Sequence, residues 1–174
     1  MKIERIFEQP NRNTFDIIGI RRWMQPYIDA SIVSVDPFAR QQTWATHNND
    51  INPDMPTQHH LHSHDFLRLL KDDGVKADLV VLDPPYSLTQ MKQIYEGMGR
   101  EIDMRESLRF YGDLRDAVTD ICTAGATVLS FGWNSIGMTK RRGYKIESIL
   151  LVCHGRAHND TICVADKRLQ KPLF

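Results

Sequence analysis

The sequence has few cysteines and no net charge. Its three cysteines, Cys122, Cys153 and Cys163, show no Cys-x-x-Cys spacing, so they resemble reduced core residues of a cytosolic protein rather than a disulfide framework. Lysine plus arginine equals aspartate plus glutamate, at 22 each, so the chain as a whole has no basic excess. Any contact with nucleic acid must therefore come from a local patch of basic residues.

Long hydrophobic runs are also missing. No apolar run approaches the length of a membrane-spanning helix, and Met1–Glu4 does not resemble the start of a signal peptide. We find no internal repeat, low-complexity segment or change of composition that would mark a linker. With 174 residues, 41% of them hydrophobic and 25% charged, the composition is that of a soluble domain with a full core. We expect a single domain over residues 1–174, located in the cytoplasm and without a membrane partner.

The most informative stretch is Ala77–Ser87. Within it, Leu79–Leu82 is a short apolar run, which predicts a strand buried on both faces as in a parallel sheet. The run stops at Asp83, and the two prolines that follow cannot donate to a sheet ladder, so the backbone must leave the sheet stiffly at its carboxyl edge. Ligands bind at that edge in open α/β sheets. A carboxylate, backbone carbonyls and the ring of Tyr86 there suit a planar ligand with an amino group.

The rest of the chain alternates between expected helices and strands. Helices are expected over residues 17–28, 64–71, 87–95 and 104–123, and further strands over 31–35, 44–48, 126–131, 144–154 and 161–167. Residues 1–13 are expected to be irregular or a surface strand, and the charged stretch 96–103 is a candidate mobile loop. The last two strands, joined by residues 155–160, predict an antiparallel hairpin. The order predicts an α/β fold with a mostly parallel sheet and an antiparallel edge.

The tetrapeptide Asp83–Tyr86, placed after an apolar strand, resembles the catalytic DPPY motif of the AdoMet-dependent methyltransferases that act on adenine N6 in DNA. The resemblance covers about residues 14–168, and it extends to a compact, often phage-encoded subgroup with DPFAR, ND-x-NP, DPPYS, SFGWNS and HNDT segments. It implies a Rossmann-like methyltransferase fold with a C-terminal antiparallel hairpin, AdoMet as cofactor and an adenine in DNA as substrate. Aspartate rather than serine before the two prolines favours adenine over cytosine N4.

The chemistry of this motif follows from its residue types. An exocyclic amine on adenine is a poor nucleophile, because its lone pair is delocalised into the ring. Asp83 and the carbonyl of Pro84 can each accept one N–H, which favours a pyramidal nitrogen with a free lone pair, while Pro85 stiffens the turn and Tyr86 stacks on the base. The target base must leave the duplex to reach such a pocket. The alternative is a rigid Pro-Pro turn that only closes a strand.

The resemblance also implies cofactor contacts by residues from several segments: Phe15, Asp36, Pro37, Phe38, Asn49, Asp50, Asp65 and Asp83. The stretch Asp36–Ala39 follows an expected strand, where the family binds the methionine part of AdoMet. The family usually continues with glycines, whereas Arg40-Gln41-Gln42 follows here. Either this loop is an ordinary connection that does not bind the cofactor, or the methionine carboxylate meets Arg40 rather than bare backbone amides.

Each of the other cofactor assignments has a structural alternative. An acid at the position of Asp50, after Asn49, usually binds a ribose diol in nucleotide-binding α/β folds, but Asp-rich loops are common. Asp65 resembles the family residue that meets the cofactor's adenine, or else it is a carboxylate favoured at the amino end of a helix. Phe15 resembles an aromatic that packs on AdoMet, or else it packs in the core.

Three further segments are candidates for binding the substrate. Trp133 and Asn134 follow a strand beside the expected pocket, and Trp133 either stacks on a base or caps the core. Lys140, Arg141 and Arg142 are the best basic patch, which either contacts phosphate or is a solvated turn. His158 lies on the hairpin that reaches the extruded base in the family, although the turn chemistry there is ordinary.

Two features limit the alternatives. His59, His60, His62 and His64 form a dense cluster without regular ligand spacing, so we expect a loop and a surface strand rather than a metal site. None of the cysteines follows a proline, so the Pro-Cys nucleophile of cytosine-C5 methyltransferases is missing.

We expect no room for a separate target-recognition domain in this chain. Specificity for a target sequence would then come from loops or from a homodimer or partner subunit, or the protein would need little sequence specificity. A degenerate AdoMet- or nucleic-acid-binding protein, and an enzyme that acts on RNA, a small amine or cytosine N4, remain open.

Overall fold

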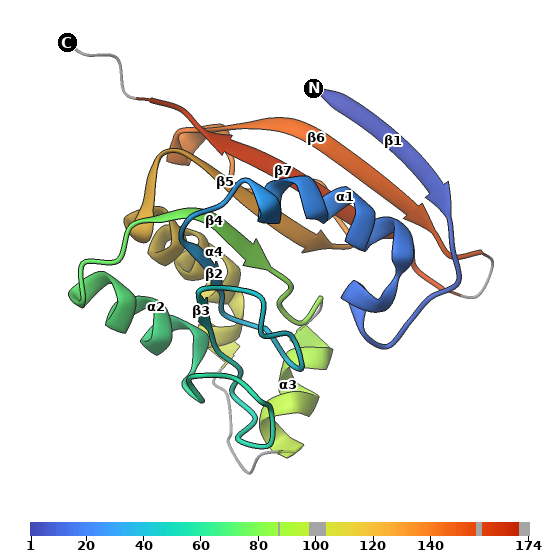
Figure 1. The fold of residues 1–174 in the computed structure, drawn as a ribbon. Coiled ribbons are helices and arrows are strands. Elements are labelled where there is room, and N and C mark those ends of the chain that lie inside the picture. Colours follow the sequence, from blue (N-terminus) through green and yellow to red (C-terminus); the bar gives the residue numbers. More distant parts are fainter. Residues whose placement is uncertain (87, 98–103, 156–157, 171–174) are drawn as a thin grey trace.

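The computed structural model of the chain describes residues 1–86, 88–97, 104–155 and 158–170. Seven strands form one sheet in the order β1-β6-β7-β5-β4-β2-β3 (Figure 1). The strands are β1 (Lys2–Phe7), β2 (Ser34–Asp36), β3 (His47–Asn48), β4 (Ala77–Leu82), β5 (Cys122–Gly132), β6 (Tyr144–Cys153) and β7 (Thr161–Arg168). The helices are α1 (Ile18–Asp29), α2 (Ser63–Asp72), α3 (Leu88–Gly97) and α4 (Met104–Ile121), with the 3₁₀ turns η1 (Thr14–Asp16) and η2 (Lys140–Arg142).

The sheet is mostly parallel, as predicted. Among the described strands only β7 runs antiparallel, to both β5 and β6, and the pair β6–β7 is the predicted hairpin. The predicted antiparallel edge is wrong, because β7 lies inside the sheet and β1 closes that side by pairing in parallel with β6. A hairpin pattern shows which two strands pair, but not whether a third strand from the other end of the chain adds to it.

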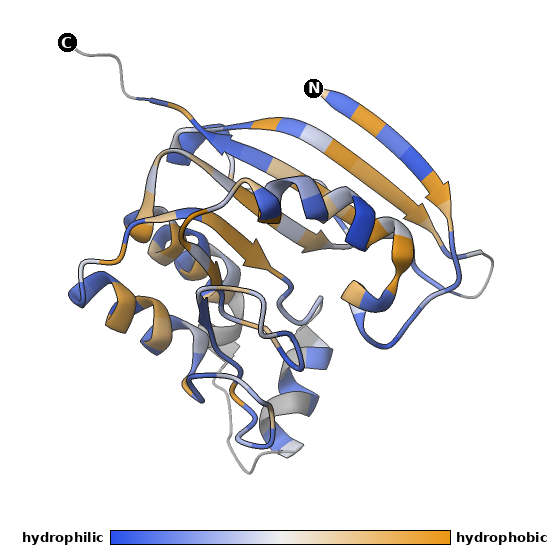
Figure 2. Ribbon diagram, viewed as in Figure 1, coloured by the Kyte–Doolittle hydropathy of each residue, from blue (hydrophilic) through white to orange (hydrophobic). Residues whose placement is uncertain are grey.

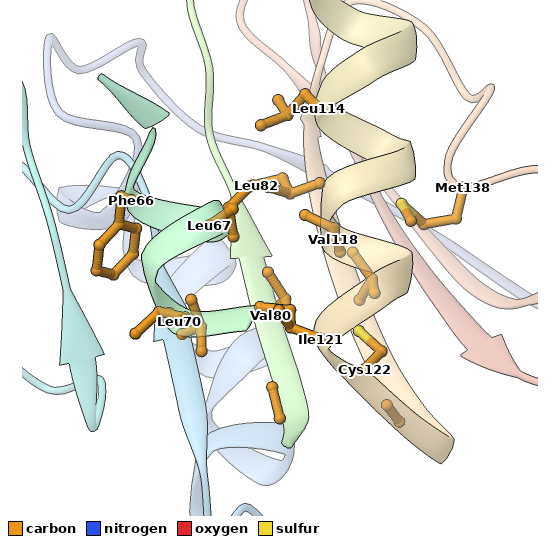
Figure 3. Close-up of a cluster of buried hydrophobic side chains, with 14 of the residues drawn as sticks. Phe66, Leu67, Leu70, Val80, Leu82, Leu114, Val118, Ile121, Cys122 and Met138 are labelled. Atoms are coloured by element: carbon orange, nitrogen blue, oxygen red, sulfur yellow. The ribbon is translucent and has the colours of Figure 1, made fainter. Parts of the chain in front are cut away.

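The central strand β4 is buried on both faces, and its side chains alternate between two cores. Leu79 and Val81 pack with α1, β5 and β7, whereas Val80 and Leu82 pack with α2 and α4 (Figure 3). These four side chains are 0–3% exposed. Burial of a Val or Leu side chain contributes about 1.5–3 kcal/mol, so this strand anchors the segment that follows it. The orange colour of β4 and β5 in Figure 2 shows the same apolar centre.

Several predicted boundaries shift in the structure. The strand predicted over residues 44–48 is reduced to His47–Asn48, and α4 ends at Ile121 rather than 123 because β5 begins at Cys122. Residues 2–7 form an edge strand, one of the two possibilities for the amino-terminal stretch. The predicted mobile loop over 96–103 lies mostly outside the described residues, apart from the end of α3.

None of the helices in the described part of the chain combines the length and the apolar character that a membrane crossing requires.

Candidate active site

A cavity of about 860 Å³ lies at the edge of the sheet where the parallel strands end. Residues that directly follow β2, β4 and β6 line it, namely Pro37, Asp83 and His154. The carboxyl edge of an open α/β sheet is the usual place for a ligand, and this volume is that of a site for a small molecule. The position of the cavity follows from the topology, since all these strands point the same way.

The cavity brings together many of the predicted site residues. Those that line it are Pro37, Phe38, Asp50, Asp83, Pro84, Pro85, Tyr86, Trp133 and His158. Those that do not are Phe15, Asp36, Asn49, Asp65, Asn134, Lys140, Arg141 and Arg142.

Asp83 and Tyr86 form the centre of the site. The Tyr86 hydroxyl donates a hydrogen bond of 2.7 Å to Asp83 Oδ1, and Thr14 Oγ1 lies 3.0 Å from the same hydroxyl. Burial raises the pKa of Asp83, while hydrogen bonds from Tyr86 and Thr14 and the charge of Arg40 act in the opposite direction. Burial also raises the pKa of Tyr86 well above its usual value, so the phenol stays protonated and remains a donor.

The turn after Asp83 is held by side chains from two helices. The backbone N–H of Tyr86 donates to Gln90 Oε1 of α3 at 2.8 Å, and the Tyr111 hydroxyl of α4 donates to the Pro85 carbonyl. The Tyr86 ring then meets Trp133 edge-on, with ring centroids 5.8 Å apart. The Pro85 carbonyl is thus engaged, while both Pro84 and Pro85 line the cavity.

Asp36 is fully buried beside this cavity. Its Oδ1 accepts the Phe38 N–H at 3.0 Å, but its Oδ2 has no hydrogen-bond partner among the described residues. Burial raises the pKa of Asp36 well above its ordinary value, and the nearby carboxylates of Asp83 and Asp50 add to the effect. Asp36 does not line the cavity, so its predicted contact with the cofactor stays a prediction.

Asn49 and Asp50 have different functions in the structure. The Asn49 amide donates to the carbonyls of Leu61 and Pro37 and accepts the Leu61 N–H, so it joins two loops of the cavity wall. Asp50 lines the cavity and accepts backbone N–H groups of Arg40 and Asn52 at 3.0 and 2.9 Å. Of the two, Asp50 is therefore the carboxylate that can meet a ribose diol.

Two other predicted cofactor residues lie elsewhere. Phe15 is 7% exposed and packs edge-on against Phe131 at 5.2 Å, which matches its core alternative. Asp65 pairs with Arg68 of the same helix at 2.9 Å, and both side chains are largely exposed. Thr14 and Ser63, which lie near these two in the sequence, line the cavity instead.

An apolar wall of the cavity was missed by the sequence interpretation. It is made by Ile51, Met55, Leu61 and Phe110, together with the predicted Phe38. Phe110 comes from α4 and meets Phe38 with ring centroids 6.4 Å apart. Ile51 directly follows Asp50, which is a signal that could have found it, but nothing near Phe110 in the sequence points to a ligand.

The loop after β2 carries Arg40-Gln41-Gln42 where the resembling methyltransferases have glycines. Residues 37–46 of this loop, all of them described, contain no helix. Within this loop Arg40 has a φ of 51°, a left-handed conformation that costs a non-glycine residue about 1–3 kcal/mol. Its guanidinium donates to the Arg12 carbonyl at 2.9 Å, and both arginines line the cavity.

The predicted substrate residues are spread over a wider area. Lys140–Arg142 forms η2, where Arg142 pairs with Asp116 of α4 at 2.6 Å. Asn134 lines a smaller neighbouring cavity of about 200 Å³ behind Tyr86. That these residues bind the substrate stays a prediction.

His154 lies between the end of β6 and His158 in the chain, and its ring has two partners. The buried His154 ring contacts the Glu8 carbonyl at 2.8 Å and Thr161 Oγ1 at 2.9 Å, and both His154 and Thr161 line the cavity. This ring therefore joins the ends of β1 and β6 to the start of β7.

Of the histidines in residues 59–64, His59, His62 and His64 pack on aromatic rings. His59 lies 5.3 Å from the ring of Phe66, and His64 lies 5.0 Å from that of Phe110. They therefore help to build the wall behind the cavity.

Comparisons with known proteins identify the fold. No family model matches the chain, and no curated protein does. Among solved structures, TrmN from Thermus thermophilus is 13% identical with a TM-score of 0.56, and the match covers 88% of this chain and 49% of TrmN. NSun6 from Pyrococcus horikoshii, solved with SFG, is 12% identical with a TM-score of 0.53, and the match covers 82% of this chain and 49% of NSun6. HI0767 from Haemophilus influenzae, a candidate methylase, is 12% identical with a TM-score of 0.51, and the match covers 88% of this chain and 96% of HI0767.

These similarities confirm the Rossmann-like methyltransferase fold. The chain spans about half the length of TrmN and NSun6. At this level of identity the likeness extends to the fold alone, so the activity has to be argued from the site.

Proposed function

We propose that this chain transfers a methyl group from AdoMet to the exocyclic N6 of adenine in DNA. The observation that carries the proposal is the position of Asp83, a carboxylate at the end of β4 whose Oδ1 accepts a hydrogen bond of 2.7 Å from Tyr86 at the cavity. Support comes from the methyltransferase fold, in which this edge of the sheet carries the ligand site.

Asp83 and the turn that follows orient the amine. The carboxylate accepts one N–H of the amine and the Pro84 carbonyl accepts the other, which directs the nitrogen lone pair away from both acceptors. After transfer the nitrogen carries one proton too many, and ionised Asp83 is placed to accept it. Both tasks need the ionised carboxylate. Burial raises the pKa of Asp83, and the hydrogen bonds from Tyr86 and Thr14 partly oppose that rise and so favour ionisation.

The aromatic pair Tyr86 and Trp133 supports an extruded base. Trp133 is 40% exposed, which is unusual for so large an apolar ring and leaves one surface for stacking. An adenine inside a duplex cannot reach the floor of this cavity, so the base must be flipped out of the helix.

The other end of the cavity suits the cofactor. When bound, AdoMet supplies an activated methyl group on a positively charged sulfur. Asp50 would hold the ribose hydroxyls and the apolar wall around Ile51 and Phe110 would pack on the adenine ring, whereas Asp36 is buried and does not line the cavity. The carboxylates of Asp50 and Asp83, which line the cavity, also favour a ligand that carries positive charge.

A transfer assay tests the proposal. With labelled AdoMet and adenine-containing duplex DNA, Asp83→Ala should lower methyl transfer by roughly 100-fold or more, since it removes the acceptor that orients and deprotonates the amine. Asp72→Ala, an exposed carboxylate on α2, is the matched control and should keep the wild-type rate. Circular dichroism should show that both variants are folded. Wild-type transfer by Asp83→Ala would overturn the mechanism.

The substrate class is tested with the same label. Adenine-containing DNA, RNA of the same sequence, free adenosine and DNA whose only exocyclic amines are on cytosine are compared side by side. Transfer to RNA, nucleoside or cytosine but not to adenine in DNA would contradict the proposed substrate.

A further inference from the structure

Arg40 adopts a backbone conformation that its side chain does not favour. Its φ of 51° lies in the left-handed region, where glycine is comfortable and a long side chain is strained. The family pattern has glycines in this loop. A non-glycine residue persists in such a conformation only when the surrounding structure holds it there, and strained residues gather at ligand sites.

The backbone of Arg40 is fixed to the cavity. Its N–H donates to Asp50 Oδ2 at 3.0 Å, so the loop after β2 is attached to the carboxylate that ends β3. The guanidinium donates to the Arg12 carbonyl at 2.9 Å, which orients it at the cavity rim. A guanidinium carries five N–H donors, and a single bond to a carbonyl leaves capacity for an anion.

Acidic and basic side chains share the surroundings of Arg40, because Asp50, Asp83 and Arg12 also line the cavity. Asp36 is fully buried and does not line the cavity, and the charges of Asp83 and Asp50 add to the burial that raises its pKa. A ligand that brings its own carboxylate into this part of the cavity is repelled unless a cation lies there. Arg40 lines the same cavity as Asp50 and Asp83, and its charge opposes the rise that burial causes in the pKa of Asp83, so its guanidinium can supply that compensation.

We propose that the Arg40 guanidinium binds the α-carboxylate of the methionine part of AdoMet, in the place of the backbone amides that a glycine-rich loop would offer. This inference rests on the proposed function, because it assumes that AdoMet is the ligand of the cavity. It accounts for the arginine at a position with glycine-like geometry. Two parallel N–H donors match the two oxygens of a carboxylate.

Calorimetric titration with two ligands tests the proposal. AdoMet carries the carboxylate, and decarboxylated AdoMet lacks only that group. Arg40→Gly keeps the backbone conformation and removes the guanidinium, so it should weaken AdoMet binding by roughly 10- to 100-fold, the loss expected for a charged hydrogen bond, and leave decarboxylated AdoMet nearly unchanged. Arg40→Asn, which also tolerates a positive φ, should behave alike, whereas Arg40→Lys should restore part of the affinity. Arg68→Ala, whose side chain pairs with Asp65 outside the cavity, is the control.

The outcomes separate the proposals. Equal weakening for both ligands would assign Arg40 a merely structural role, and unchanged AdoMet binding by Arg40→Gly would also overturn the inference. A loss of DNA affinity with AdoMet binding intact would assign Arg40 to a backbone phosphate instead. In each of these cases the wild-type chain binds AdoMet and the proposed cofactor stands. If the wild-type chain binds neither ligand, the proposed function itself fails.

Discussion

The hydroxyl of Tyr86 donates a hydrogen bond of 2.7 Å to the carboxylate of Asp83, three residues before it. This bond brings the Tyr86 side chain back to the end of β4 across the two prolines. The bond couples the ionisation of the acid to the position of the aromatic ring. Changes at Tyr86 should therefore alter the pH dependence of the reaction as well as its rate.

We predict that Tyr86→Phe shifts the acid limb of the pH–rate profile to higher pH. The hydrogen bond from Tyr86 lowers the pKa of Asp83, so its loss raises that pKa further above the ordinary value. Because only the ionised carboxylate accepts the amine proton, the variant should be slow at low pH and should approach the wild-type rate at high pH. The measurement is kcat/KM for methyl transfer as a function of pH.

Tyr86→Ala is the control for this prediction. It removes the ring as well as the hydroxyl, so it should lose about 1–3 kcal/mol of base stacking and stay slow at every pH. An acid limb that does not move in Tyr86→Phe would mean that Asp83 is not the group whose ionisation limits the rate.

Trp133→Ala should weaken substrate binding without unfolding the protein. The ring is 40% exposed and contacts Tyr86, so its removal leaves little new cavity in the core. Loss of one stacked ring should raise KM for the nucleic acid by roughly 5- to 100-fold, with kcat changed much less. Ile136→Ala, in the same loop and 55% exposed, should change neither constant. An unchanged KM in Trp133→Ala would show that this ring only caps the core.

Asp36→Asn should alter how stability depends on pH. Folding raises the pKa of Asp36, so the folded state keeps a proton that the unfolded chain loses above about pH 4. The wild-type free energy of unfolding should therefore fall as pH rises from that value to the raised pKa, by about 1.4 kcal/mol per pH unit for one proton. Asparagine does not titrate, so the variant lacks this loss and should gain stability relative to wild type as pH rises.

Urea unfolding at several pH values between 5 and 8 measures this difference. Asp72→Asn, at an exposed site on α2, should follow the wild-type curve throughout. A difference between Asp36→Asn and wild type that stays constant with pH would contradict the raised pKa.

The sequence was most informative where local pattern and burial agree. The apolar run before Asp83 predicted β4, the two prolines predicted its abrupt end, and the cavity lies at that end. Each of these predictions depends on neighbouring residues alone. The pairing of β1 with β6 could not be predicted in this way, because it joins residues far apart in the chain.

The cofactor side of the cavity shows the same limit. Asp50 and Phe38 were predicted from their places after strands, but Phe110 reaches the cavity only because α4 packs with α2 and β4 on one face of the sheet. Asp65 was assigned to the cofactor by its place in the chain order. In the structure, Ser63 at the start of α2 lines the cavity, and Asp65 pairs with Arg68 of the same helix. Helix rotation depends on the packing of both faces, which a single motif does not contain.

Gly137→Ala should destabilise the protein by about 2–4 kcal/mol. Gly137 has a φ of 57°, and a Cβ atom built there would lie 2.2 Å from Asp166 Oδ2. That oxygen accepts the Met138 N–H at 2.9 Å, so the carboxylate cannot move aside without breaking a buried hydrogen bond. The strain of a positive φ and the loss of this bond act together. Gly74→Ala, with a φ of 72° but open space around it, isolates the backbone contribution and should cost only about 1 kcal/mol. Equal losses in the two variants, measured by chemical denaturation, would show that the contact with Asp166 contributes nothing.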